Sequence, residues 1–193
     1  MEFLVTMTTH VPEGVSTEDV DDVRAREAAH SRELADLGHL LRLWRPPLQP
    51  GEWRSIGLFA AADATRLEEV LASMPLRIWR KDDVTPLSPH PNDPPSPTAR
   101  RADAREFLTT FTQTVGAESP TLEEARAAES RSARRLADQG YLLRLWTLPG
   151  PGRALGLWQA DSEEEVQAVL ARLPLGPWLT IETTPLTRHP SDP

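Results

Sequence analysis

One phrase of eleven residues occurs twice in this chain of 193 residues, as LADLGHLLRLW ending at Trp44 and as LADQGYLLRLW ending at Trp146. Shorter matches keep the same order in both halves: Glu2-Phe3-Leu4 with Glu106-Phe107-Leu108, Met74-Pro75-Leu76 with Leu173-Pro174-Leu175, and Thr85-Pro86-Leu87 with Thr184-Pro185-Leu186. An internal repeat constrains the architecture more than any local signal does. Two copies of this length indicate two small domains, because a solenoid needs more and shorter units.

A segment rich in proline and charge separates the two copies, from Pro89 to Arg105. Such a composition is typical of a partly extended linker. We therefore expect a first domain at residues 1–88, a linker at 89–105 and a second domain at 106–193.

The first copy has the sequence signals of four strands and two helices. Runs of β-prone residues predict strands at 3–8, 39–44, 55–60 and 78–84. Ser16 and Asp63 are typical N-caps, while Gly38 and Pro75 are typical of the residues that follow a helix. They predict helices that run from Ser16 to Leu37 and from 64 to 73.

The second copy repeats this order. Its first helix should open at Pro120 or Thr121 and end at Gly140, and its second should open at Asp161 or Ser162. The order β-α-β-β-α-β is that of the ferredoxin-like fold, in which both helices cover one face of the sheet. The other face needs a cover, and a second copy can supply it.

The strand that carries the repeated phrase suggests what this second face holds. Strict alternation places Leu41 and Leu43 on one side, and Leu40, Arg42 and Trp44 on the other. If Leu41 and Leu43 meet the helices, then Arg42 and Trp44 face away from them. The alternative is that each arginine pairs with an acidic neighbour and each tryptophan only fills the core.

We therefore expect an α+β fold with two tandem ferredoxin-like domains that pack as an intramolecular pseudo-dimer, a dimeric α+β barrel. Arg144 and Trp146 of the second copy would lie opposite Arg42 and Trp44. The enclosed space would be a pocket lined by aromatic and a few polar groups, which is the usual composition of a ligand site.

A glutamate interrupts the apolar stripe of the first helix in each copy. Glu27 stands seven residues before Leu34, and Glu129 stands seven before Leu136. A half-buried carboxylate is costly unless it is paired or protonated, so its pKa should rise toward the range useful for general acid–base catalysis. The alternative is a boundary glutamate that reaches water or pairs with Arg24, Arg126 or a strand arginine.

The composition disfavours several other classes of function. The chain has no cysteine, no apolar run of membrane-spanning length and no apparent secretory signal, so we expect a cytoplasmic protein without a membrane partner. A net charge of −8 argues against nucleic acid as the main partner. The five histidines lack metal-ligand spacing, and no nucleotide-binding loop is present, so we expect neither a metal nor a cofactor.

Together these landmarks resemble the muconolactone isomerase family. The resemblance covers nearly the whole chain outside the linker, and each half has about the size of one family member. It rests on these features: the opening strand Phe3-Leu4-Val5-Thr6-Met7, the helix glutamates Glu27 and Glu129, the segments Gly38 to Trp44 and Gly140 to Trp146, the Leu-Pro-Leu type motifs after the second helices, and the closing Arg188-His189-Pro190.

The resemblance implies a cofactor-independent isomerase that shifts a double bond in a small unsaturated lactone or related carbonyl compound. Glu27 or Glu129 would move the proton, and Arg42 or Arg144 would bind the substrate carboxylate or the oxygen of a dienolate intermediate. The expected substrate-binding residues are Trp44, Trp146, His90, His189 and Arg188. The family forms dimeric barrels and often larger rings, which leaves a homo-oligomer open here.

Three polar positions depart from the family pattern. Ser88-Pro89 replaces the closing arginine of the first copy, Arg42 and Arg144 stand where the family often has histidine, and Ser55 and Ala154 replace an asparagine. These changes keep two alternatives open. One is a cyclase, or an epoxide or double-bond isomerase, of specialised metabolism that acts on a larger apolar substrate. The other is a non-catalytic binding or oligomerisation module.

Overall fold

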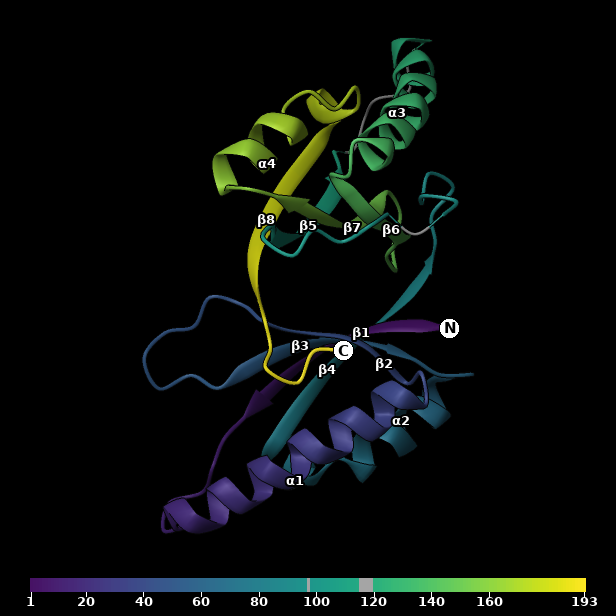
Figure 1. Cartoon of the computed structure of the whole chain (residues 1–193). Coiled ribbons are helices and arrows are strands. Elements are labelled where there is room, and N and C mark those ends of the chain that lie inside the picture. The colour runs from purple at the N-terminus through teal and green to yellow at the C-terminus, as the bar shows by residue number, and fades with distance from the viewer. Residues whose placement is uncertain (97, 115–119) are drawn as a thin grey trace. The chain divides into compact units, whose positions relative to one another are not determined.

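The computed structural model describes residues 1–96, 98–114 and 120–193 (Figure 1). The chain divides into two compact units. The first unit consists of Met1–Leu87 and Thr187–Pro193, and the second consists of Ser88–Leu186. Each unit is a four-stranded antiparallel sheet with two helices on one face, so the expected α+β fold with two tandem ferredoxin-like domains is confirmed.

The elements of the two halves follow one order. In the first half they are β1 (Glu2–Thr9), α1 (Thr17–Asp36), β2 (Leu40–Arg45), β3 (Arg54–Ala60), α2 (Ala64–Ser73), the 3₁₀ helix η1 (Pro75–Trp79) and β4 (Arg80–Pro89). In the second half they are β5 (Arg105–Gln113), α3 (Pro120–Asp138), β6 (Leu142–Thr147), β7 (Arg153–Ala160), α4 (Glu163–Leu170), the 3₁₀ helix η2 (Gly176–Trp178) and β8 (Leu179–Arg188).

The strand order is the same in both sheets. β1 lies between β3 and β4, and β2 lies outside β3. In the second unit β5 lies between β7 and β8, and β6 lies outside β7. All these pairs are antiparallel, as the ferredoxin-like fold requires.

The helix boundaries match the sequence signals closely. Ser16 and Asp63 accept hydrogen bonds from the N–H groups of the first turns of α1 and α2, and Ser162 does so for α4. Gly38 and Gly140 have positive φ angles of 73° and 82°, a conformation that favours glycine at the end of a helix. One boundary was wrong: Ile78 and Trp79 lie in η1, because Pro75 opens a short helical turn and β4 begins only at Arg80.

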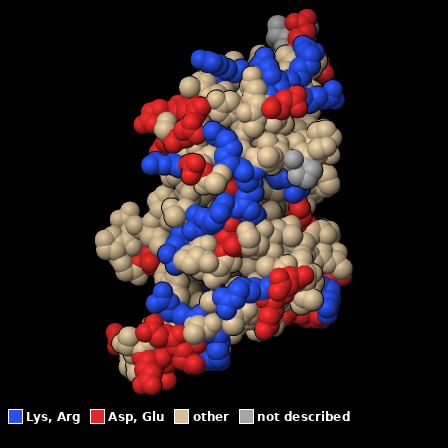
Figure 2. Space-filling view, viewed as in Figure 1, with Lys and Arg blue, Asp and Glu red and all other residues tan. Residues whose placement is uncertain are grey.

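Acidic side chains gather at the starts of two helices (Figure 2). The first turn of α1 carries Glu18 and Asp19, and the first turn of α4 carries Glu163, Glu164 and Glu165. Negative charge there favours the helix, because the unpaired N–H groups of a first turn carry partial positive charge. Among the described residues, no helix is long and apolar enough to cross a membrane.

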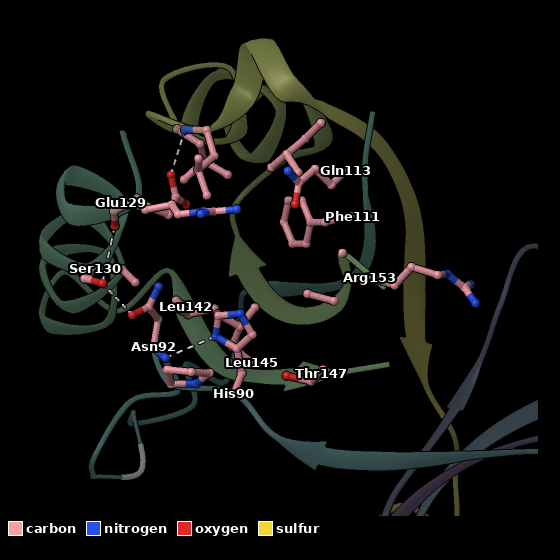
Figure 3. A pocket seen from close by; sticks show the side chains of 18 of the residues that line it. His90, Asn92, Phe111, Gln113, Glu129, Ser130, Leu142, Leu145, Thr147 and Arg153 are labelled. Carbon is pink, nitrogen blue, oxygen red and sulfur yellow. Dashed lines mark hydrogen bonds between the residues drawn. The ribbon is translucent and has the colours of Figure 1, made fainter. Parts of the chain in front are cut away.

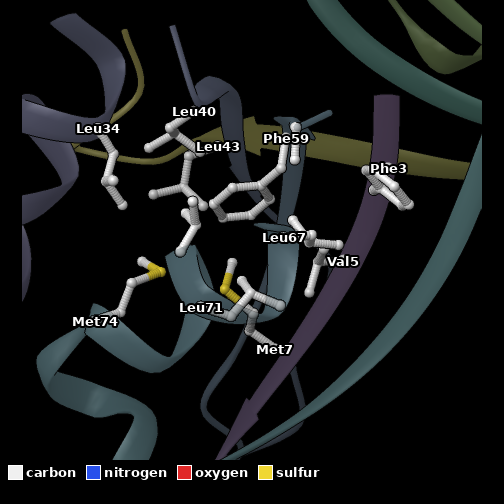
Figure 4. Packing of buried hydrophobic residues seen from close by; sticks show 12 residues of the cluster. Phe3, Val5, Met7, Leu34, Leu40, Leu43, Phe59, Leu67, Leu71 and Met74 are labelled. Carbon is white, nitrogen blue, oxygen red and sulfur yellow. The ribbon is translucent and has the colours of Figure 1, made fainter. Parts of the chain in front are cut away.

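The core of each unit lies between its sheet and its helices. Figure 4 shows the core of the first unit. Leu40 and Leu43 of β2 both join this core, together with Leu34 of α1. The expectation that Leu41 and Leu43 share the helix side was therefore wrong for Leu41. The pairing of β2 with β3 shifts between Leu40 and Arg42, and an extra residue at such a bulge breaks the alternation of side chains. The second unit has the same shift, between Leu142 and Arg144.

The last strand of each half ends in the unit of the other half. Thr187 and Arg188 of β8 pair with β2 and belong to the first unit. Ser88 and Pro89 of β4 pair with β6 and belong to the second unit. Residues 90–93, which follow β4 of the first half, therefore belong to the second unit. Residues 189–192, which follow β8 of the second half, belong to the first unit.

Candidate functional site

Each unit contains a cavity between its first helix and its sheet. The cavity of the second unit has a volume of about 450 Å³, and that of the first unit about 330 Å³. Both fall in the range of roughly 300–1,000 Å³ that is usual for small-molecule sites. Glu129 lines the larger cavity and Glu27 the smaller one, so both helix glutamates face a cavity.

The second-unit cavity is mostly apolar (Figure 3). Its walls come from α3, from the strands β5, β6 and β7, and from the loop after α4, with Phe111, Leu142, Leu145, Trp158, Leu173 and Leu179 among the lining residues. Figure 3 shows Glu129 on the helix side and His90 on the opposite side, near the end of β6. Arg126, Arg153 and Gln113 also line the cavity, so Glu129 faces a mainly apolar surface that carries two guanidinium groups.

Glu129 is half-buried in this apolar wall. The Leu175 N–H donates to its Oε2 at 2.9 Å. Burial is the main influence on the pKa of Glu129 and raises it, while the Leu175 hydrogen bond acts in the opposite direction. Within the described part of the chain, no cation forms an ion pair with Glu129. A carboxyl group in such a place can take up a proton at a pH closer to neutrality than an exposed one.

Glu27 occupies the same position in the first unit but has a charged partner. The Leu76 N–H donates to its Oε2 at 2.8 Å, and Nη1 of Arg80 donates to its Oε1 at 3.1 Å. Arg80 is nearly buried and also binds Asp82 through Nε at 2.6 Å. Burial is the main influence on the pKa of Glu27 and raises it, as for Glu129, although the Leu76 hydrogen bond and then the Arg80 guanidinium act in the opposite direction. The alternative in which the glutamate pairs with a strand arginine thus describes Glu27.

The described residues of the second unit form no counterpart of this ion-pair network. Leu179 and Ile181 begin β8 at the positions that Arg80 and Asp82 occupy in β4. Arg80 was missed by the sequence reasoning, although the contrast between Arg80-Lys81-Asp82 and Leu179-Thr180-Ile181 was visible in the repeat. The two glutamates therefore lie in chemically different surroundings.

His90 and His189 each close one cavity. His90 lines the second-unit cavity, and His189 lines the first-unit cavity. The Nδ1 atom of His90 accepts the Asn92 N–H at 3.1 Å, and that of His189 accepts the Ser191 N–H at the same distance. When the rings are neutral, the proton must therefore lie on Nε2.

Both histidines are neutral at pH 7. Burial lowers the pKa of His90. Burial and then the Arg45 and Arg24 guanidinium groups lower the pKa of His189 to about 4. Each ring therefore keeps a neutral Nε2–H that can donate a hydrogen bond.

Arg42 and Arg144 lie outside both cavities. Nε of Arg42 donates to Asp192 at 3.1 Å, and Nε of Arg144 donates to Asp93 at 3.3 Å. Each carboxylate also accepts a backbone N–H, from Leu43 for Asp192 and from Leu145 for Asp93. These ion pairs attach the segments that carry His189 and His90 to the sheet.

Neither of these two cavities is therefore lined by a helix glutamate together with Arg42 or Arg144. Trp44 and Trp146 are buried, and the guanidinium of the neighbouring arginine lies over each ring at 4.7 and 4.9 Å. Neither tryptophan lines either of these two cavities, and nor does Arg188, which lies near Asp192 with Nε at 3.4 Å. Arg42 and Trp44 still alternate with the core-facing Leu43, and the bulge brings Leu40 instead of Leu41 into that core.

The sequence reasoning also missed Asp93, Asp192 and Trp158. The aspartates were visible as a repeated His-Pro-x-Asp, at 90–93 and 189–192. Trp158 lines the second-unit cavity, and its Nε1 is a buried donor without a hydrogen-bond partner among the described residues. The first unit has Phe59 at this position. In the described ranges, no group of three or more histidine, aspartate or glutamate side chains could hold a metal ion.

Comparison with known proteins gives a consistent result for both halves. The sequence profile of the family described as muconolactone delta-isomerase matches residues 1–93 and again 106–192. Muconolactone Delta-isomerase 1 of Acinetobacter lwoffii is 33% identical over 92 residues, which are 48% of this chain and 93% of that protein. The Muconolactone Delta-isomerase of Cupriavidus pinatubonensis is 32% identical over 92 residues, with 48% and 97% covered.

Solved structures resemble nearly the whole chain. Chlorite dismutase from Candidatus Nitrospira defluvii, in complex with imidazole, superposes with a TM-score of 0.66 at 9% identity, covering 98% of this chain and 92% of its own. A heme-binding protein from Thermus thermophilus has a TM-score of 0.61 at 12% identity, with 99% and 93% covered. At such identities the likeness concerns the fold alone, and it agrees with two ferredoxin-like domains in tandem.

Proposed function

The chain belongs to the muconolactone delta-isomerase family, and from this premise we propose that it shifts a double bond in an unsaturated lactone or related carbonyl compound, without a cofactor, in the cavity of the second unit. The observation that carries the proposal is Glu129. It is a half-buried carboxyl group with a raised pKa, in an apolar cavity, and no ion pair holds it among the described residues.

The proposed reaction is a proton transfer between two carbons. The carboxylate of Glu129 removes the acidic proton beside the carbonyl group, so that a C–H bond breaks and an O–H bond forms on the carboxyl. The electron pair moves into a dienolate, whose oxygen carries the negative charge. Glu129 then returns the proton to the carbon at the far end of the conjugated system, and the double bond has moved. No oxidant, reductant or second substrate is consumed.

Two neutral donors can stabilise the dienolate oxygen. His90 lines the cavity and keeps a proton on Nε2, because its Nδ1 accepts the Asn92 N–H. Trp158 lines the same cavity with a buried N–H that lacks a partner among the described residues. A donor placed in advance where charge develops lowers the barrier without reorganisation during the reaction. We assign this role to His90 and Trp158 and not to Arg42 or Arg144, which hold Asp192 and Asp93.

The decisive experiment compares the two glutamates in the full chain. Purified wild-type protein, Glu129→Gln and Glu27→Gln are incubated with muconolactone and a panel of unsaturated lactones in D₂O. The shift is followed by ultraviolet absorbance, and deuterium uptake by NMR. We expect Glu129→Gln to lose a factor of about 10²–10⁴ in turnover, as for removal of a general base. Glu27→Gln, whose wild-type residue is paired with Arg80, should retain most turnover. If Glu129→Gln remains fully active, the proposal is wrong.

A second candidate is supported by the size and lining of the same cavity. A volume of about 450 Å³ with mostly apolar walls suits a larger apolar substrate, as a cyclase or an epoxide or double-bond isomerase of specialised metabolism would take. The panel therefore includes lactones with long alkyl substituents. A KM that falls steadily with chain length, together with slow turnover of muconolactone, would favour this candidate. Failure of every compound to bind would instead favour a non-catalytic module.

A further inference from the structure

The first-unit cavity differs from its counterpart in the second unit in the number and position of the guanidinium groups that line it. Arg45 and Arg80 line it at positions where the second-unit cavity has Thr147 and Leu179. Trp53 also lines it, and Arg24 of α1 lies over the Trp53 ring at 5.4 Å. The smaller cavity is thus lined by three guanidinium groups, and the larger one by two, those of Arg126 and Arg153.

Only part of this positive charge is neutralised within the unit. Arg80 is held by Glu27 and Asp82, so the buried end of the cavity is balanced. The one ion pair of Arg24 among the described residues is long, 3.5 Å to the exposed Asp21. The Arg45 side chain has neither a hydrogen bond nor an ion pair among the described residues. The uncompensated charge therefore lies at Arg45 and Arg24, on the side of the cavity where His189 closes it.

His189 adds a neutral donor to this pair of cations. Its Nδ1 accepts the Ser191 N–H at 3.1 Å, which leaves the proton on Nε2. No described residue accepts a hydrogen bond from Nε2. Two guanidinium groups and a neutral N–H around one space of about 330 Å³ suit a small planar anion.

We propose that the first-unit cavity is a second ligand site, which binds a small organic carboxylate between Arg45, Arg24 and His189. Glu27 takes no part in proton transfer there, because Arg80 holds it. The gene duplication would then have left one cavity for reaction and made the other a binding site. The binding claim does not depend on the proposed isomerase activity, since a non-reacting anion tests it.

Titration calorimetry of the full chain with benzoate tests this site, and neutral benzamide serves as the control ligand. Arg45→Thr introduces the residue that the second unit has at the same position. Because Arg45 is exposed, this variant should fold, and an unchanged thermal midpoint checks that it does. We expect saturable binding of benzoate and a loss of about tenfold or more in affinity, the size of one charge-assisted hydrogen bond. Thr147→Val in the second-unit cavity is the matched control and should leave the affinity unchanged.

Several results would overturn the proposal. They are equal affinity of Arg45→Thr and wild type for benzoate, equal affinity of the wild type for benzamide and benzoate, or no saturable binding of benzoate at all. A loss of affinity in Thr147→Val would place the anion in the second-unit cavity and would equally reject it. Turnover is not measured in this experiment, so its failure and the failure of the isomerase proposal are separate results.

Discussion

At the residue scale, one glutamate is repeated in two environments. Glu129 and Glu27 stand at equivalent positions and accept equivalent backbone N–H groups, from Leu175 and Leu76. The difference is Arg80, which donates to Glu27 and has the apolar Leu179 as its counterpart. A single exchange of arginine for leucine on the neighbouring strand therefore separates a carboxylate held in an ion pair from one without an ion pair among the described residues.

The raised pKa of Glu129 predicts how stability depends on pH. The folded state binds this proton more tightly than the unfolded chain, whose glutamate has a pKa near the ordinary 4.5. The contribution of Glu129 to stability is therefore fully present below that value and is lost as pH rises through the raised pKa. Glu129→Gln should lack this loss and should be more stable than the wild type at pH 7. Urea unfolding from pH 4 to 8 measures it, and a Gln variant with an unaltered pH profile would contradict it.

Replacement of Trp158 should change stability and turnover in different directions. A buried N–H without a partner costs free energy, on the order of 1–3 kcal/mol. Trp158→Phe introduces the residue of the first unit at this position, Phe59, so the ring should still pack. We expect unchanged or higher thermal stability together with a turnover lowered about tenfold or more, as for loss of one donor to a developing charge. Equal turnover in both proteins would show that the indole N–H does not contact the substrate.

At the scale of elements, the sequence predicted the helix boundaries, which depend on local interactions. Ser16, Asp63, Gly38 and Gly140 mark the helix ends because a cap satisfies its own turn and needs no distant partner. The half-buried position of the glutamates followed from helical periodicity alone. The bulge after Leu40 could not be predicted, because it depends on the pairing of β2 with β3. That bulge brings Leu40 instead of Leu41 into the core, while Arg42 and Trp44 lie outside that core cluster and line neither of the two cavities described.

The segment after β8 predicts a difference between two equivalent aspartates. The Asp192 side chain is fully buried and Arg42 is 9% exposed, whereas Asp93 and Arg144 are 23% and 35% exposed. Asp192→Asn leaves a nearly buried guanidinium uncompensated and should cost about 3 kcal/mol. Asp93→Asn should cost about 1 kcal/mol or less, because solvent screens the pair. Hydrogen exchange of β2 and β6, each compared with wild type, measures the loss in each unit separately. Equal losses would contradict the ranking.

At the scale of the whole molecule, duplication was the strongest signal in the sequence, and it predicted the two tandem domains. It did not indicate that the final segment of each half belongs to the other unit, because a repeat shows which residues correspond and not which copy they complete. The pairing of Thr187 and Arg188 with β2, and of Ser88 and Pro89 with β6, is a property of the folded chain. Each unit thus receives its histidine and its closing aspartate from the segment that follows the last strand of the other half.

This exchange predicts that a short truncation acts on one cavity only. Removal of residues 189–193 deletes His189 and Asp192, which belong to the first unit, while 90–93 and the whole second unit remain. We expect faster hydrogen exchange in β2, because Leu43 N–H and Arg42 lose their acceptor, and a loss of benzoate binding. Glu129-dependent turnover should persist, since the residues that line the second-unit cavity are all retained. Full-length protein carrying Asp192→Asn is the control for the loss of the ion pair alone. The contrary outcome is a turnover of the truncated chain as low as that of Glu129→Gln, with unchanged protection of β6 from hydrogen exchange. The reacting cavity would then include the deleted segment, and the assignment of the reaction to the second unit would be wrong.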